Sequence, residues 1–165
     1  MKRAFKAILF HKGVAFVATF LWMGIIFYLS HQPAEQSKEL SGGILVWVEE
    51  VLAFLALSVD GEGLHFFIRK GAHFFAYFVL GILLVHSLRL VSIPSKIKPF
   101  FYAFYALFIS IVYAVIDEWH QTFVPGRSGE WRDVFIDSIG SLVGIILYCI
   151  ICIVRFEKEG NWEEK

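Results

Sequence analysis

The sequence has few residues of the kind that cross-link a chain or bind a metal. It contains two cysteines, Cys149 and Cys152, among 165 residues. A C-x-x-C spacing can form a redox or metal pair, but this pair lies in an isoleucine-rich apolar run with no histidine or second cysteine pair nearby. We therefore interpret both as small apolar residues of a packed or lipid-facing helix, and predict neither a disulfide nor a metal there.

The chain also lacks net charge, because 15 lysine and arginine residues balance 15 aspartate and glutamate residues. A neutral chain gives no indication of a polyanionic partner, so nucleic-acid binding is not expected. The sequence contains no repeat, low-complexity tract, strand pattern, phosphate-binding glycine loop or nucleophile elbow. A set of His, Asp and Glu side chains could hold a divalent metal, but no spacing such as H-x-x-x-H supports one. We predict no metal and no cofactor.

Apolar residues are present in excess. Hydrophobic residues make up 58% of the chain and the mean hydropathy is +0.65, whereas a soluble domain is typically about 45–50% apolar. Runs close to the roughly 20 residues that cross a bilayer predict transmembrane helices at about 13–30, 70–90, 100–118 and 132–154. The first run is longer than the core of a signal peptide, so we expect a retained helix, with cleavage as the alternative.

A fifth apolar segment, at about 44–57, is too short to cross a bilayer. It predicts an interfacial or re-entrant helix, with Trp47 at the level of the lipid headgroups. Polar stretches with glycine at 31–43 and 58–63 predict loops on either side. The expected fold class is therefore an all-α membrane protein, one domain over residues 1–165, with four transmembrane helices and one short interfacial or re-entrant helix.

Basic residues divide unequally between the two ends of this bundle. With four spans, both termini and the loop at 89–98 share one side and hold ten lysine and arginine residues, against five on the other side. The positive-inside rule then predicts that both termini are cytoplasmic. The segments at 69–77 and 117–137 would consequently meet at the extracellular face.

The densest polar stretch, from Asp117 to Asp137, lies between two of the most apolar segments. Charges placed against long apolar runs are costly in a membrane and by default mark function. The stretch predicts the end of one helix, a turn at Pro125-Gly126 and the start of the next helix. The residues that share a helix face by their spacing are Glu118 and Gln121 before the turn, and Asp133, Asp137, Gly140 and Gly144 after it. Two polar helix faces are thus expected to lie side by side.

Three parts of the chain carry short motifs. The stretch just described contains Glu118-x-x-Gln121, Phe123-Val124-Pro125-Gly126-Arg127, Arg132-Asp133-Val134 and Asp137-x-x-Gly140. Upstream are Ser30-x-Gln32-Pro33 and Arg69-Lys70-x-Ala72-His73-Phe74-x-x-Tyr77-x-x-Leu80-Gly81. Together these motifs closely resemble the VanZ-like family of bacterial membrane proteins, over about residues 22–144. Two positions depart from the family pattern, since many members carry Asn at Asp137 and Glu at Ala76.

The resemblance implies a role at the outer face of the membrane. The VanZ-like family is associated with reduced susceptibility to glycopeptide antibiotics of the teicoplanin type, which act on that face. The resemblance therefore implies cell-envelope modulation and low-level antibiotic resistance of this kind. It does not imply any particular catalytic chemistry.

The side chains gathered at the predicted outer face allow three interpretations. They can form an ion-pair network that ties helix ends together. They can bind the headgroup of a membrane lipid or lipid-linked cell-wall precursor, because arginine suits bidentate contact with phosphate or carboxylate. They can also form an enzyme, a hydrolase or transferase acting on an outer-leaflet headgroup, with His73, Glu118 or Asp133 as catalytic candidates. The predicted binding residues are Arg69, Lys70, His73, Tyr77, Asp117, Glu118, Gln121, Arg127, Arg132, Asp133 and Asp137.

Two packing expectations complete the prediction. Arg69 or Lys70 should pair with an acid of the second motif region, because a lone charge near the apolar boundary is costly. Gly140 and Gly144 form a G-x-x-x-G motif that predicts close helix packing within the bundle, with homodimerisation as the alternative. Four histidines are expected to lie outside the polar cluster, namely His11, His31, His65 and His86.

Overall fold

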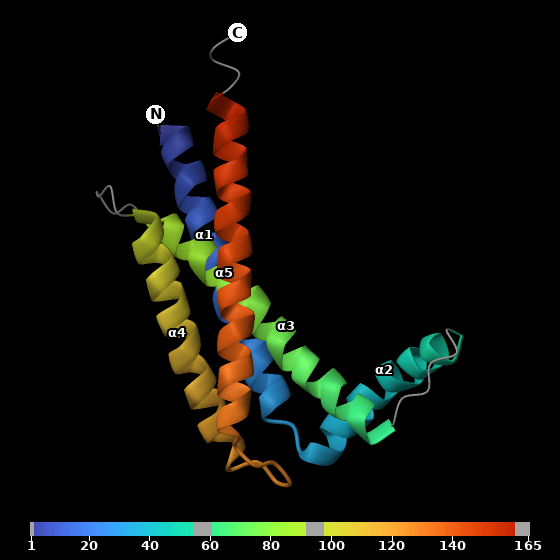
Figure 1. Cartoon of the computed structure of the whole chain (residues 1–165). Coiled ribbons are helices and arrows are strands. Elements are labelled where there is room, and N and C mark those ends of the chain that lie inside the picture. The colour runs from blue at the N-terminus through green and yellow to red at the C-terminus, as the bar shows by residue number, and fades with distance from the viewer. Residues whose placement is uncertain (1, 55–60, 92–97, 161–165) are drawn as a thin grey trace.

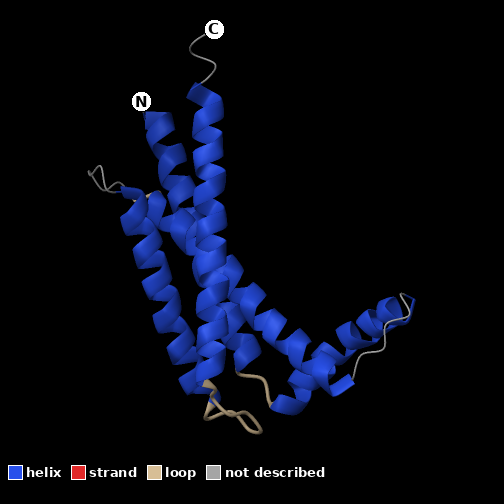
Figure 2. Ribbon diagram, in the orientation of Figure 1, coloured by secondary structure: helices blue, strands red, loops and turns tan. Residues whose placement is uncertain are grey.

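The computed structural model describes residues 2–54, 61–91 and 98–160. The described residues form helices connected by turns and loops (Figure 1). The helices are α1 (Lys2–Ser30), α2 (Ala34–Phe54), α3 (Gly61–Arg89), α4 (Lys98–Gln121) and α5 (Trp131–Gly160). No strand occurs in these ranges (Figure 2). The predicted all-α fold class is confirmed.

Four of the helices contain a segment long and apolar enough to cross a membrane, as predicted. These segments are between 20 and 27 residues long, which suits a hydrocarbon core about 30 Å thick at about 1.5 Å of rise per residue. Their outer faces carry exposed large apolar side chains such as Phe20, Phe104 and Ile150, as expected for helices surrounded by lipid. The segments are His11–Ser30, Gly63–Arg89, Phe100–Gln121 and Trp131–Val154.

The start of α1 and the end of α5 lie at one end of the bundle, and the loop between α4 and α5 lies at the opposite end (Figure 1). α5 packs along α3 and α4, and α1 packs against α3. α2 leaves the end of α1, projects away from the bundle and contacts α3 (Figure 1). The α1–α2 connection, the start of α3 and the α4–α5 loop therefore come together, although they are far apart in the sequence.

The contact between α3 and α5 depends on glycine. A Cβ placed on Gly140 would lie 2.3 Å from the carbonyl oxygen of Phe74, and one on Gly144 would lie 2.2 Å from that of Phe78. Gly81 makes an equally close approach from α3, where a Cβ would lie 2.4 Å from a backbone oxygen of α5. Small residues let helix backbones approach closely in membranes. The predicted role of the G-x-x-x-G motif in packing within the bundle is confirmed.

Hydrogen bonds between helices fix the rotation of α1 on α3. The hydroxyls of Thr19 and Ser87 lie 2.9 Å apart, and Trp22 Nε1 donates to the carbonyl oxygen of Ala76 at 2.8 Å. Such bonds stabilise membrane bundles because lipid offers no alternative partner. They hold the end of α1 beside the polar residues of α3.

The predicted fold is wrong at the start of α2. This helix begins at Ala34 and not near residue 44, so the segment 34–43, expected to be a loop, is helical. The carbonyl oxygen of Pro33 accepts a bond from the Ser37 N–H at 3.0 Å in the first turn. The residues that follow are mostly strong helix formers, and their propensity outweighs the Gly42-Gly43 pair on which the loop prediction rested.

Two neighbouring predictions fall partly outside the described residues. The expected end of that helix, at 55–57, lies outside them, as does the first half of the expected loop at 58–63. The second half of that loop is helical, because α3 begins at Gly61. The first turn of α3 therefore extends further toward α2 than the apolar run alone indicates.

Candidate functional site

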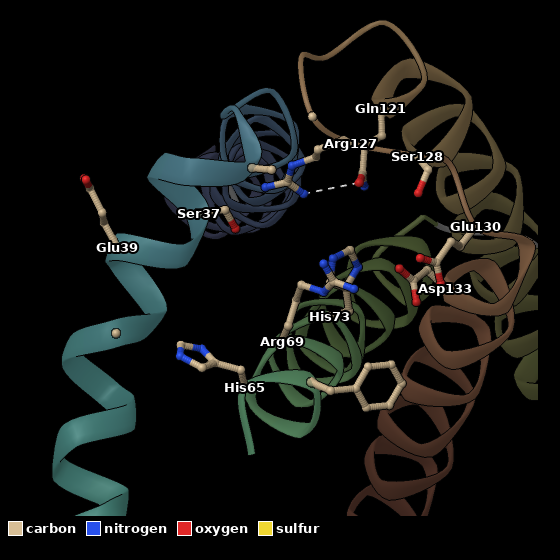
Figure 3. Close-up of a pocket in the computed structure, with 14 residues that line it drawn as sticks. Ser37, Glu39, His65, Arg69, His73, Gln121, Arg127, Ser128, Glu130 and Asp133 are labelled. Atoms are coloured by element: carbon tan, nitrogen blue, oxygen red, sulfur yellow. Dashed lines mark hydrogen bonds between the residues drawn. The ribbon is translucent and has the colours of Figure 1, made fainter. Parts of the chain in front are cut away.

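A cavity of about 710 Å³ opens at the end of the bundle that carries the α4–α5 loop (Figure 3). Its walls come from α2, the start of α3 and the α4–α5 loop, and Figure 3 shows Arg127 facing Arg69 and His73 across it. This volume falls within the range typical of ligand pockets, about 300–1,000 Å³. The ionisable and amide side chains that line it are Glu39, His65, Arg69, His73, Gln121, Arg127, Glu130 and Asp133.

A second cavity, of about 260 Å³, adjoins the first. The two share Ser37, Arg69, His73 and Arg127 as lining residues. The second cavity reaches into the bundle between α1 and α3, where its walls are mainly apolar. The residues that line only this inner cavity are Ile26, Leu29, Ser30, Gln32, Ile68, Ala72, Ala76, Tyr77 and Asp117. A polar outer chamber thus leads to a more apolar inner one.

Arg127 clamps the α4–α5 loop to the end of α1. Its Nε donates to the carbonyl oxygen of Gln32 at 2.9 Å, its Nη1 to Gln121 Oε1 at 3.2 Å, and its Nη2 to the carbonyl oxygen of Leu29 at 3.3 Å. The preceding Gly126 has φ of 75°, a backbone conformation that favours glycine. Burial lowers the pKa of Arg127, and the positive charge of Arg69 lowers it further. The partners of this guanidinium are therefore neutral oxygens, and its charge is not compensated by an ion pair.

Arg69 supplies a second cation to the same space. It lies on the exposed side of α3 and lines both cavities. Within the described parts of the chain, no carboxylate lies within ion-pair distance of Arg69 or Arg127. Two guanidinium groups without acidic partners therefore line the cavity, an arrangement suited to an anion.

Lys70 behaves differently from its neighbour. It is buried, forms an ion pair with Asp133 of α5, and lies 3.2 Å from Glu130 Oε2. The predicted pairing between the two motif regions is confirmed by this contact. The charge of Lys70 is used within the protein, so Lys70 ties α3 to the start of α5.

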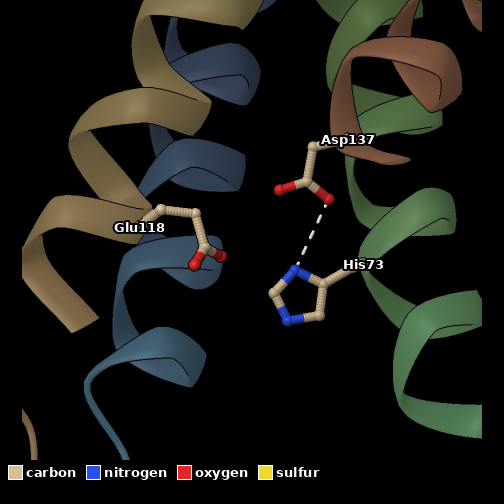
Figure 4. Close-up of side chains that lie close together, drawn as sticks. All are labelled: His73, Glu118 and Asp137. Carbon is tan, nitrogen blue, oxygen red and sulfur yellow. Dashed lines mark ion pairs between the residues drawn. The ribbon is translucent and has the colours of Figure 1, made fainter. Parts of the chain in front are cut away.

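A buried polar cluster joins three helices, α3, α4 and α5 (Figure 4). His73 Nδ1 of α3 is 3.4 Å from Asp137 Oδ1 of α5, and Glu118 of α4 faces both (Figure 4). Glu118 is fixed by two donors, because Gln121 Nε2 donates to its Oε1 at 3.0 Å and the Glu130 N–H donates to its Oε2 at 2.9 Å. The cluster is therefore preorganised by its own surroundings.

This arrangement is built from the motifs of one family. The family model described as VanZ/LLP1 matches residues 15–152. The chain belongs to the VanZ/LLP1 family. The match is longer than the resemblance expected over residues 22–144, and it overlaps all four membrane-length segments. Neither a curated protein nor a solved structure matches the chain.

The predicted site residues of this VanZ/LLP1 chain fall into three groups. Those that line a cavity are Arg69, His73, Tyr77, Asp117, Gln121, Arg127 and Asp133. Those that are buried behind the cavity walls are Lys70, Glu118 and Asp137. Arg132 is exposed and lines neither cavity. Among the three catalytic candidates, Asp133 is engaged by Lys70, while His73 faces both cavities.

The sequence prediction missed several residues of the site. Glu130 lines the outer cavity and pairs with Lys70, and nothing in its turn sequence indicated this. His65 was expected outside the polar cluster, yet it lines the outer cavity. It lies four residues before Arg69, so the shared helix face was a usable signal once α3 is known to start at Gly61.

Two contacts join the end of α1 to α4. Asp117 Oδ2 accepts a bond from the Ser30 hydroxyl at 2.7 Å, which links the Ser30-x-Gln32-Pro33 motif to the polar face of α4. His31 was expected outside the cluster and does lie outside both cavities; its Nδ1 is 3.0 Å from His120 Nε2 on the surface. Ser30 therefore belongs to the site, while His31 and His120 form a separate pair.

Proposed function

We propose that this VanZ/LLP1-family membrane protein binds the anionic headgroup of a membrane lipid or lipid-linked cell-wall precursor in the outer cavity. The observation that carries the proposal is that Arg69 and Arg127 line one cavity without an acidic partner among the described residues. Two like charges placed together at a low-dielectric boundary are unfavourable until an anion joins them. A phosphate or carboxylate would accept bidentate bonds from either guanidinium.

The rest of the outer cavity suits the other groups of such a headgroup. Glu39 and Glu130 line it on opposite sides, from α2 and the α4–α5 loop. Carboxylates accept hydrogen bonds from hydroxyl and ammonium groups. A headgroup that combines an anion with sugar hydroxyls or an amine would therefore find partners for both.

The inner cavity supports a lipid in preference to a free anion. Its lining is mainly apolar and begins where the outer cavity ends, at Arg69 and Arg127. Apolar groups next to the phosphate of a lipid would gain from burial there, at roughly 25 cal/mol per Å². An amphipathic ligand thus matches the order of the two chambers.

We place this cavity at the extracellular face, on the distribution of lysine and arginine between the loops. Binding of a precursor or lipid at that face would modulate the cell envelope. It would also account for low-level resistance to glycopeptides of the teicoplanin type, through a change in the target's surroundings and not through destruction of the drug.

A second candidate function is that of an enzyme, a hydrolase or transferase acting on the same headgroup. It is favoured by His73, which lines both cavities and contacts Asp137. An imidazole held by a carboxylate is a common general base or acid. In this alternative, Glu118 or His73 would exchange a proton with the bound headgroup.

The proposal is tested on the full chain in lipid nanodiscs that contain phosphatidylglycerol and phosphatidylcholine, by native mass spectrometry of retained lipid. The wild type should retain the anionic lipid selectively, and Arg69→Ala should lose that selectivity. Arg132→Ala is the matched control, because it removes the same charge at the same end of the bundle but outside the cavities. Equal retention of both lipids by the wild type, or an equal loss in the two variants, would overturn the proposal.

A further inference from the structure

The buried cluster below the cavity contains more acid than its neighbours compensate. Asp117, Glu118 and Asp137 are 1%, 5% and 0% exposed. Lys70 is already paired with Asp133 and Glu130. Among the described residues, the one ion pair to any of these three carboxylates is that of His73 with Asp137. Buried carboxylates are costly unless they are paired or coordinate a metal.

The oxygens of this cluster also lack hydrogen-bond partners. Neither oxygen of Asp137 has a hydrogen-bond partner within the described ranges, and the nearby His73 Nδ1 contacts Asp137 Oδ1 as an ion pair at 3.4 Å. Asp117 Oδ1 and the Tyr77 hydroxyl are buried and equally unpartnered. Buried polar atoms are normally satisfied, so each such atom calls for an explanation. Several unpartnered buried oxygens among neighbouring side chains indicate a binding site for a cation.

The geometry fits a metal ion. One ligand atom from each of His73, Glu118 and Asp137 lies within 4.8 Å of the other two. At bond lengths of about 2.0–2.2 Å, two ligands of a tetrahedral ion lie about 3.4 Å apart. His73 Nδ1 and Asp137 Oδ1 already have this separation, at 3.4 Å. The ligand atom of Glu118 lies within 4.8 Å of the other two, and its long side chain can move closer by a change of rotamer.

The hydrogen bonds to Glu118 are of the kind that orient a carboxylate toward a metal ion. Gln121 and the Glu130 N–H each donate to one of its oxygens, and each oxygen retains a second lone pair. Hydrogen bonds of this kind orient carboxylate ligands and are part of most metal sites. The chain therefore holds Glu118 in place without using up its capacity to coordinate.

We propose that His73, Glu118 and Asp137 bind one divalent transition-metal ion of the Zn²⁺ or Mn²⁺ class. The imidazole nitrogen disfavours Mg²⁺ and Ca²⁺, which prefer oxygen ligands throughout. Three protein ligands leave a further position open, as in catalytic zinc sites, and His73 borders both cavities. The sequence prediction of no metal rested on local spacing, and it could not reveal ligands that come from three different helices.

This inference is independent of the proposed headgroup binding, since the metal is measured without an anionic lipid. The full chain, purified with a tag that lacks histidine and stripped with EDTA, is placed in phosphatidylcholine nanodiscs and titrated with Co²⁺. The visible bands of protein-bound Co²⁺ report the site, and Zn²⁺, Mn²⁺ and Mg²⁺ are added as competitors. About one equivalent of Co²⁺ should bind, and Zn²⁺ should displace it while Mg²⁺ should not.

The surface pair of His31 and His120 is a second place where a metal could bind. All titrations are therefore repeated with His120→Ala, which should leave the bands unchanged. His73→Ala and Asp137→Asn should each abolish them, and Gln121→Leu should weaken binding by about 10–100-fold. His86→Ala is the matched histidine control, because this residue contacts Tyr148 away from the cluster.

Several outcomes would overturn the proposal. One is a wild-type protein that gives no Co²⁺ bands, a result that does not depend on whether any variant folds. Another is loss of the bands in His120→Ala alone, which would assign them to the surface pair. Unchanged binding in monodisperse Asp137→Asn protein would exclude the cluster as the site.

Discussion

Lys70 of α3 and Asp133 of α5 form a buried ion pair that joins the two motif regions of the chain. The pair lies at the edge of the outer cavity, and Glu130 contacts the same ammonium group at 3.2 Å. Two adjacent basic residues thus have opposite roles: Lys70 points into the protein and is neutralised, while Arg69 faces the cavity. The difference separates residues that hold the site from residues available to a ligand.

This pair predicts a specific pattern of stability. Lys70→Met should lower the free energy of unfolding by about 3–5 kcal/mol, because it leaves the buried Asp133 carboxylate uncompensated. Asp133→Asn should lower it less, because Glu130 still contacts the Lys70 ammonium at 3.2 Å. The double variant should lose less than the sum of the two single losses. Unfolding in detergent mixtures measures all three, with Arg132→Ala as a neighbouring charge change that should have little effect. Strictly additive losses would show that the two residues act separately.

Replacing Arg127 and replacing Arg69 should have different effects on thermal stability and on headgroup affinity. Arg127→Ala removes a clamp of three hydrogen bonds as well as a cavity charge, so it should lower both thermal stability and headgroup affinity. A lost hydrogen bond to a charged group costs about 1.5–3 kcal/mol, which corresponds to a loss of affinity of about 10- to 150-fold. Arg69→Ala should lower affinity and leave the melting temperature unchanged. Lipid titration and thermal unfolding of the same preparations separate the two effects.

The contact between α3 and α5 predicts a sharp glycine requirement. Gly144→Ala places a Cβ 2.2 Å from a backbone carbonyl oxygen of α3, so the helices must separate and the protein should be destabilised. Gly24→Ala is the matched control, since nothing lies within 4 Å of a Cβ at that position of α1. Alanine there should be neutral or slightly stabilising, because glycine costs about 0.5–1 kcal/mol inside a helix. Equal effects of the two changes on thermal stability would contradict the close packing.

The sequence predicted four helices long and apolar enough to cross a membrane, because the apolar length that a span needs follows from the thickness of the bilayer. It also predicted that the motifs at 69–77 and 117–137 meet. Two spans, the second and the third, separate these motifs, so both motifs lie at the same end of the bundle. It did not predict where α2 begins, since helix propensity and glycine content gave opposite signals there. The sequence also did not predict that His73, Glu118 and Asp137 meet. The rotation of each helix about its axis determines this meeting, and it is set by contacts elsewhere, such as that of Gly140 with the Phe74 carbonyl.

Glu130, in the α4–α5 loop, makes another contact that the sequence alone does not predict. Its backbone N–H reaches Glu118 because the preceding Gly129 packs against α4, where a Cβ would lie 2.5 Å from the Glu118 carbonyl oxygen. Neither the turn residues nor their spacing predict so close an approach. The contact is visible only once α4 and α5 are placed side by side.

The orientation of the bundle gives a further prediction. In a background without Cys149 and Cys152, a cysteine at Ser128 should react in intact spheroplasts with a membrane-impermeant thiol reagent. Ser128 is exposed on the α4–α5 loop, at the end that lysine and arginine counts place outside. A cysteine at Val91, at the opposite end of α3, should react only after the cells are opened. The reverse labelling pattern would place the cavity in the cytoplasm.

The last prediction separates headgroup binding from catalysis. Glu118→Gln keeps the size of the side chain but removes its charge, and one of its two acceptor oxygens becomes an amide nitrogen facing a donor. If the protein binds without catalysis, purified wild type should return its lipid unchanged in mass, and Glu118→Gln should retain part of the binding. If Glu118 is a general acid or base, the wild type should convert a headgroup and the variant should lose about 10²–10⁴-fold in rate with the lipid still bound. Mass spectrometry of lipid recovered after incubation, with Arg132→Ala carried in parallel, distinguishes the two, and turnover that disappears only in Glu118→Gln would replace the binding proposal with an enzyme.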